Sequence, residues 1–284
     1  MALLALLGGC ASPRHLILQG VASELASQGN APEDDLVLAR EASAFYLKLS
    51  ESVLRETPDN AALAAAVASG FTQYAYAFVQ LEADRIEAKD SSAAQKLRQR
   101  AARLYRRAQG HAMNALERQT PGFAKALASN VPADWPRLQH EQVDLAYWAS
   151  ASWGGWIALT KDDPDTVADF PLAVRLARLA WAVSPDYGGG ALLSLMGTFE
   201  AARPGGSRAQ AAQYFDQAIA LGAGKNAGPL VAKAESIALP AGDRPAFDAL
   251  LKQALTASEM QHDLQNAVMR ARAQWLLETA DDLF

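Results

Sequence analysis

The sequence predicts an all-α protein of tetratricopeptide-like helical hairpins, arranged as a curved or ring-like solenoid. Apolar side chains recur with the 3.6-residue period of an α-helix through almost the whole chain after Pro13. No stretch alternates apolar and polar residues between hairpin turn signals, so we expect no strand. Small residues around a central position, followed by proline, recur at the spacing of such hairpins, as in 173–185. The spacing is degenerate, and no strict period runs throughout.

Helix-start signals define the elements of the first half. Asn30, with Pro32 and acidic residues behind it, is typical of a helix start, and Asn60 and Asp90 are placed to cap later helices. Prolines mark the ends and the connectors. In order, we expect a helix at 15–28, one from the signal at 30–35 to 57, one from 60 to about 81, one from 90 to about 119, a connector at 122–136, and a Trp-rich helix ending near 161.

The second half continues the same pattern. Asp163-Pro164 starts a helix that reaches Pro185, with a candidate break at Phe170-Pro171. The run 188–190 is Gly-Gly-Gly and predicts a flexible turn. The remaining expected helices occupy 191–203, 207–221, 226–239, 244–257 and 263–282.

Composition limits the classes of function. The chain has 284 residues, of which 50% are hydrophobic, enough to bury a substantial core. Each hairpin of a solenoid needs only its neighbours to bury its apolar face, so we expect 16–284 to form one helical domain. The net charge is -5, and an acidic chain lacks the clustered Lys and Arg that neutralise phosphates. A nucleic-acid partner is therefore not expected.

One basic run stands out within a helical pattern. Its members are Lys96, Arg98, Arg100, Arg103, Arg106 and Arg107. A solvated helix face is one interpretation, and contact with an acidic partner or lipid headgroups is the other.

The N-terminus predicts export and lipidation. Residues 1–9 form a short apolar signal segment, too short for a membrane span, and Leu7-Gly8-Gly9-Cys10 is similar to the bacterial lipobox. Cys10 is the chain's one cysteine and has no internal disulfide partner. We expect Cys10 to carry the lipid and 10–15 to form the tether. The alternative is a buried N-terminal helix with an incidental cysteine.

A multiply acylated cysteine holds a protein firmly to a bilayer, at about 0.8 kcal/mol per buried methylene. We expect no later segment with the length and charge-free character of a span. The body should therefore be tethered on the periplasmic side of a membrane. Ala11 rather than Asp after the cysteine favours the outer membrane over the inner one.

The sequence holds no motif for catalysis, metal or cofactor. His140 and Asp144 are four apart on one helix face, but a zinc-protease helix needs a second His where Asp144 stands. A Gly-x-Ser-x-Gly elbow, a phosphate loop and a dinucleotide fingerprint are all missing. We expect neither an enzyme nor a bound metal.

Aromatic residues are the candidates for a ligand cavity. Three of the six Trp lie in the stretch 144–171, where Gly154 and Gly155 separate two of them. Residues three apart share a helix face, and glycine between them leaves room on it. Plain core is the other interpretation of the group. The candidates for the wall of an apolar cavity are Tyr74, Tyr76, Phe78, Trp148, Trp153 and Trp156.

Several segments, in this order, resemble the T component associated with TRAP-type transporters. They are 70–79 (GFTQYAYAFV), 151–157 (ASWGGWI), 168–171 (ADFP), 185–187 (PDY) with Gly190-Ala191, Gly205-Gly206 leading into 211–219, and the end from Asn266-Ala267 and Arg270-Ala271 through Leu276-Leu277 to 281–284 (DDLF).

The resemblance implies a non-enzymatic periplasmic lipoprotein that assists an ATP-independent transporter. It implies binding to the solute-receptor component, an apolar channel or cleft for a hydrophobic ligand, and a homo-oligomer, with a trimer favoured. The family supplies no catalytic residues. The alternative function is a structural tetratricopeptide-like scaffold lipoprotein of the cell envelope, whose core around Trp153 and Trp156 would be packed.

Overall fold

The structure is a computed structural model that describes residues 13–28 and 33–284. It is 81% helix, with no strand among these residues, which confirms the all-α class. The α-helices are α1 (Pro13–Gln28), α2 (Leu36–Glu56), α3 (Ala61–Tyr74), α4 (Leu81–Ile86), α5 (Ser91–Gln119), α6 (Phe123–Leu127), α7 (Val143–Leu159), α8 (Pro164–Ala168), α9 (Phe170–Val183), α10 (Tyr187–Ala202), α11 (Arg208–Leu221), α12 (Gly228–Lys233), α13 (Arg244–Glu259), α14 (Leu264–Glu278) and α15 (Ala280–Leu283).

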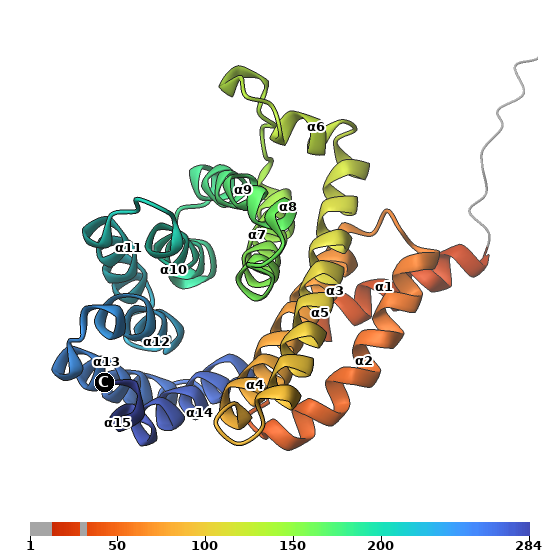
Figure 1. The fold of residues 1–284 in the computed structure, drawn as a ribbon. Coiled ribbons are helices and arrows are strands. Elements are labelled where there is room, and N and C mark those ends of the chain that lie inside the picture. The colour runs from red at the N-terminus through yellow and green to blue at the C-terminus, as the bar shows by residue number, and fades with distance from the viewer. Residues whose placement is uncertain (1–12, 29–32) are drawn as a thin grey trace, which may run out of the picture.

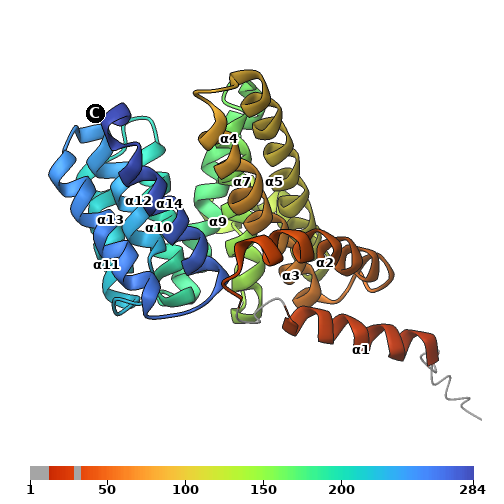
Figure 2. The ribbon, with the colours of Figure 1, turned by 90° about the horizontal axis from the view of Figure 1, so that it is seen from below.

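The helices follow one another around an arc (Figure 1). Helix α5 packs against α3 and α7, α7 packs against α9, and α10 packs against α11. The last helices bring the chain back beside its first ones, because α14 contacts α2 and an ion pair joins α14 to α4. Seen from below, α10–α14 form one block, and α1–α5, α7 and α9 form another (Figure 2). The arc therefore closes on itself at α14.

The core is also divided in two, although α10 shares its buried side chains with the first block. One large cluster of buried side chains extends from α1 to α10, with Phe71, Phe123 and Trp153 among its aromatic members. A separate cluster joins α12, α13 and α14 around Phe247 and Leu251. The two blocks are therefore joined by the packing of α10 against α9 and, at the closure, by polar contacts of α14.

The capping signals are largely as expected. The side chains of Asn60, Asp90 and Asp163 accept hydrogen bonds from backbone N–H groups at the starts of α3, α5 and α8. Asp35 caps α2, whereas the expected cap, Asn30, lies outside the described residues. The break at Phe170-Pro171 is confirmed, because Asp169 separates α8 from α9.

Two helices contain π-helical segments that the sequence did not predict. Ala75–Gln80 is π-helical and joins α3 to α4 in one long element, and Ala234–Ala238 is π-helical and follows α12. We expected plain helices at both places. A π-helical turn inserts one residue into the helical period, and such turns are frequent at functional sites.

The element Ala61–Ile86 also corrects a sequence expectation. It has the length and the mean hydropathy, 1.2, of a candidate membrane span, although we expected no such segment after the N-terminus. More than half of this apolar window is buried inside the protein, where Leu63, Val67 and Phe71 belong to the large core. Its hydropathy is that of a central core helix.

A buried carboxylate fixes α2 to α5. Glu51 is 5% exposed and accepts hydrogen bonds from Arg107, from Lys48 at 2.7 Å and, at 2.9 Å, from the ring of His111. The Arg107 guanidinium lies 4.8 Å from the centre of the Phe71 ring. Burial raises the pKa of Glu51, but the hydrogen bonds from its three partners outweigh burial and lower that pKa to about 2.

Glu51→Gln is expected to lower the free energy of unfolding at pH 7 by about 2 kcal/mol, because Arg107 loses its carboxylate. The folded-state pKa lies below the ordinary 4.5, so the unfolded chain takes up the proton first as pH falls. Denaturant unfolding should therefore show wild-type stability falling between about pH 4.5 and about pH 2, with a shallower fall in the variant. Glu41→Gln, on the exposed side of α2, is the control and should follow wild type. Equal slopes for Glu51→Gln and wild type would contradict the prediction.

Candidate functional site

The six aromatic candidates fall into two groups. Tyr74, Tyr76 and Trp156 pack around one small core with Tyr105 of α5. Phe78 is buried and meets Tyr74 edge-on at 5.4 Å. These residues come from α3, the first π-helical segment, α5 and α7, so the fold brings four of the six candidates together.

The other two candidates lie farther along α7. Trp148 meets the Tyr147 ring edge-on at 4.8 Å and donates a hydrogen bond to Asp144. It is eight residues from Trp156, or about 12 Å along the helix. Trp153 is buried in the large core, near Asp169. The structure therefore separates Trp148 and Trp153 from the group around Tyr105.

The two glycines of the Trp-Gly-Gly-Trp stretch do not leave open space. A Cβ on Gly154 would lie 2.5 Å from the Phe199 ring of α10, and one on Gly155 would lie 2.9 Å from the Tyr105 ring. Each glycine instead lets a ring from a neighbouring helix approach the α7 backbone. The expectation that glycine opens room at this point is wrong, because Phe199 and Tyr105 fill it.

The basic run of α5 is exposed at five of its six positions, but several of its side chains have partners within the chain. Arg98 pairs with Asp84 and Glu87, and Arg107 pairs with Glu51. Arg100 and Arg106 lie over the rings of Tyr74 and Trp156, at 5.8 Å and 5.3 Å. The run is thus a solvated face on which four of the six basic residues also have partners within the chain. Two of these cations lie against the aromatic group itself.

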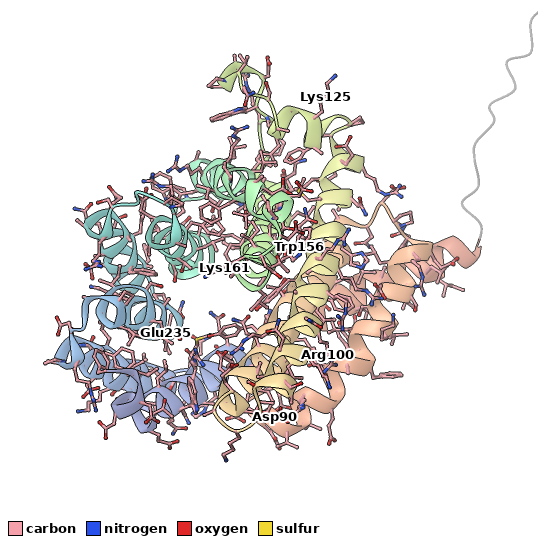
Figure 3. All side chains as sticks on the ribbon, viewed as in Figure 1. Asp90, Arg100, Lys125, Trp156, Lys161 and Glu235 are labelled. Atoms are coloured by element: carbon pink, nitrogen blue, oxygen red, sulfur yellow. The ribbon has the colours of Figure 1, made fainter. Side chains whose placement is uncertain are left out.

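A charged cluster lies beside the same aromatic group. Arg272 of α14 is 12% exposed, and its guanidinium donates to Glu235 at 2.6 Å and lies 3.1 Å from Asp84. Tyr76 adjoins this cluster, and burial, reinforced by the charge of Glu235, raises its pKa. Figure 3 labels Trp156 and Glu235, which lie along the inner side of the arc. Aromatic and charged groups therefore meet where the arc closes.

Both π-helical segments contribute residues to the site where the arc closes. The first carries Tyr76 and Gln80, and the Tyr105 hydroxyl donates to the Gln80 side chain at 2.8 Å. The second carries Glu235. The sequence pointed to Tyr76 through its aromatic neighbours, but it gave no signal for Glu235 or Arg272, whose pairing depends on the closure of the arc.

The seam between α2 and α14 holds a separate polar cavity of about 170 Å³. Asp34 and His262 line it and lie 3.3 Å apart, and Arg270 lines it while donating to Ser258. This cavity is distant in the sequence from the aromatic candidates and contains none of them.

The described residues offer little for catalysis. They contain no group of three or more His, Cys, Asp or Glu that could hold a metal ion. Asp144, which resembled part of a zinc-protease helix with His140, accepts hydrogen bonds from Trp148 and Tyr187. Cys10, the expected lipid site, lies outside the described residues.

The described residues thus form an all-helical protein that gathers aromatic and charged groups where its arc closes. The chain belongs to the TRAP transporter T-component family, whose sequence model matches residues 32–284. It is also similar to an uncharacterized protein of Treponema pallidum (strain Nichols), with 28% identity over 265 residues that cover 89% of this chain and 81% of that protein. Family membership supports an accessory role in a TRAP transporter and a membrane-associated location, and the family is not a known enzyme family.

Proposed function

We propose that this protein is a lipid-anchored periplasmic accessory that binds the solute-receptor component of a TRAP transporter. The observation that carries the proposal is the family match over residues 32–284. Cys10, in its lipobox-like context, is the proposed lipid attachment site, with the outer membrane favoured. The helices form tetratricopeptide-like hairpins in this proposal, and the chain assembles as a homo-oligomer, with a trimer favoured.

The aromatic group is the proposed contact with a hydrophobic or amphipathic ligand. Tyr74, Tyr76 and Trp156 are only half-buried, and Trp148 is half-buried at the other end of α7. The first three supply the ligand-facing wall with the buried Phe78 behind them, and Trp148, with the buried Trp153, supplies a second contact about 12 Å away. Arg100 and Arg106 over the rings suit a ligand that has both an apolar body and a negative group.

A structural scaffold of the cell envelope is the second candidate function. The observation that favours it is the filled space beside Gly154 and Gly155, which is what a packed core requires. A scaffold would use its surface for partners outside transport. The two functions differ in whether Trp156 responds to a ligand.

One experiment tests the transport function. The tagged full chain, expressed with its candidate receptor, is purified and its receptor content and Trp fluorescence are measured. We expect the receptor to co-purify, and a long-chain fatty acid to change the fluorescence of wild type but not of Trp156→Phe. If the receptor does not co-purify and the fluorescence does not change, the proposal is overturned. Receptor binding without a fluorescence change would support the receptor role and refute the ligand role. Metabolic labelling with palmitate tests the anchor separately, and Cys10→Ser should abolish the label.

A further inference from the structure

Helix α2 has an apolar face that no described residue covers. Leu38, Phe45 and Leu49 are 54%, 74% and 41% exposed. With the exposed Ala42 they are spaced three and four residues apart, so they form one continuous stripe on the helix. We call these four residues the α2 stripe. Its apolar character needs an explanation, because neighbouring apolar residues exposed together mark interaction sites.

The stripe is not the face that holds α2 in the fold. Leu47, Ser50 and Leu54 are buried and lie on the other side of the helix, which packs against α1 and α3. The Glu51 pairs also lie away from the stripe and anchor α2 to α5. The packing of α2 is therefore complete without the stripe, and the stripe is free to meet something outside the described chain.

The position of α2 in the molecule indicates what the stripe contacts. Helices α1 and α2 form one outer edge of the molecule, and in both views the first turn of α1 lies near the last turn of α2 (Figures 1 and 2). Cys10 precedes the start of α1 at Pro13 by three residues, which can span at most about 10 Å. A lipid on Cys10 would thus hold this edge, and α2 with it, at the membrane surface.

The size of the stripe favours a bilayer over a second protein chain. From Leu38 to Leu49 it is about 16 Å long, and it is no wider than the roughly 10–12 Å diameter of a helix. That footprint, on the order of 200 Å², is far below the about 800 Å² that each partner gives to a specific protein interface. An interfacial helix, in contrast, needs only one apolar strip in the headgroup region. The charges beside the stripe do not decide the occupant, because the exposed Lys48 and Glu41 flank it on the same side.

We infer that the α2 stripe docks on the surface of the lipid bilayer and fixes the orientation of the anchored protein. This inference rests on the proposed lipid attachment at Cys10, which brings α2 close to the membrane. The anchor supplies the attachment, and the stripe, lying flat, sets which face of the arc points away from the bilayer. Phe45 and Leu38 carry the contact, since they are the most exposed of the three large side chains in the stripe.

The first experiment measures vesicle binding by the full chain with Cys10→Ser, so that no acyl chain contributes. Vesicles of phosphatidylethanolamine and phosphatidylglycerol are floated with the protein. Adding Leu38→Ser and Phe45→Ser should lower the partition coefficient at least tenfold, since each buried side chain contributes about 1.5–3 kcal/mol. The control pair, Val131→Ser with Leu221→Ser, removes exposed apolar side chains away from α2 and should bind like its parent. Equal binding by both pairs, or no binding by the parent, would overturn the inference.

A second measurement identifies the occupant. The chain has one cysteine, so Cys10→Ser with Phe45→Cys carries a single thiol for an environment-sensitive dye. Its emission should shift to the blue when vesicles are added, and a dye at Val131→Cys should not respond. A blue shift without vesicles that grows with protein concentration would assign the stripe to a second copy of the chain. A shift independent of concentration would assign it to the chain's own N-terminal segment. Either result overturns bilayer docking without affecting the palmitate test of the anchor.

Discussion

Arg272→Ala is expected to lower the free energy of unfolding by about 3 kcal/mol, because it removes the one cation between two partly buried carboxylates. Arg272 donates to Glu235 through two of its nitrogens and faces Asp84 through the third. Its guanidinium also lies 4.6 Å from the centre of the Trp275 ring. Alanine leaves Glu235 without its cation, leaves Asp84 with only the 3.4 Å pair to Arg98, and removes the stem that packs on the indole.

Denaturant unfolding of the purified full chain measures this effect, and hydrogen exchange locates it. Exchange should rise first in α13 and α14, because the second core loses its polar tie to α4. Arg118→Ala is the matched control. Its partner Asp59 is 3.6 Å away and both side chains are largely exposed, so a change below about 0.5 kcal/mol is expected. A stable Arg272→Ala protein with unchanged exchange would mean that packing of α10 against α9 holds the two blocks without the charges.

The secondary structure could be predicted well from local chemistry. Helical periodicity, proline positions and capping side chains depend on residues a few positions apart, and the sequence displays all of them. Asn60, Asp90 and Asp163 cap their helices as expected. The π-helical segments could not be predicted in this way. One extra residue in a turn is stabilised by tertiary contacts, as where Tyr105 of α5 bonds to Gln80.

The candidate site could be predicted only in part, for a related reason. Large aromatic residues among small ones predicted a site that includes Tyr74, Tyr76 and Trp156, and the fold does bring these three together. The charged residues of the same site, Glu235 and Arg272, look like ordinary surface residues in the sequence. These two residues pair only because the arc closes, and the closure depends on the angles at which many successive helices pack. A pattern of neighbouring residues does not predict those angles.

Gly190→Ala is expected to lower the free energy of unfolding by about 3 kcal/mol, from a strained backbone and an overpacked contact. Gly190 has φ +100°, which a residue with a Cβ rarely adopts. An added Cβ would lie 2.6 Å from the carbonyl oxygen and 2.8 Å from the Cα of Ala218. These are backbone atoms of α11, so no side chain can turn away to make room. Relief would require α10 and α11 to move apart.

The adjoining Gly189 isolates the cause of this loss. It also has a positive φ, +58°, but a Cβ there meets nothing within 4 Å. Gly189→Ala should therefore show the backbone strain alone, about 1 kcal/mol, and the difference between the variants measures the close approach of α10 to α11. Thermal and denaturant unfolding of both proteins give that difference. Equal losses would mean that the Gly-Gly-Gly turn serves only to let the chain reverse, as the sequence alone suggested. A larger loss for Gly190 would show that the turn also sets the spacing between α10 and α11, on which the path of the arc toward its closure depends.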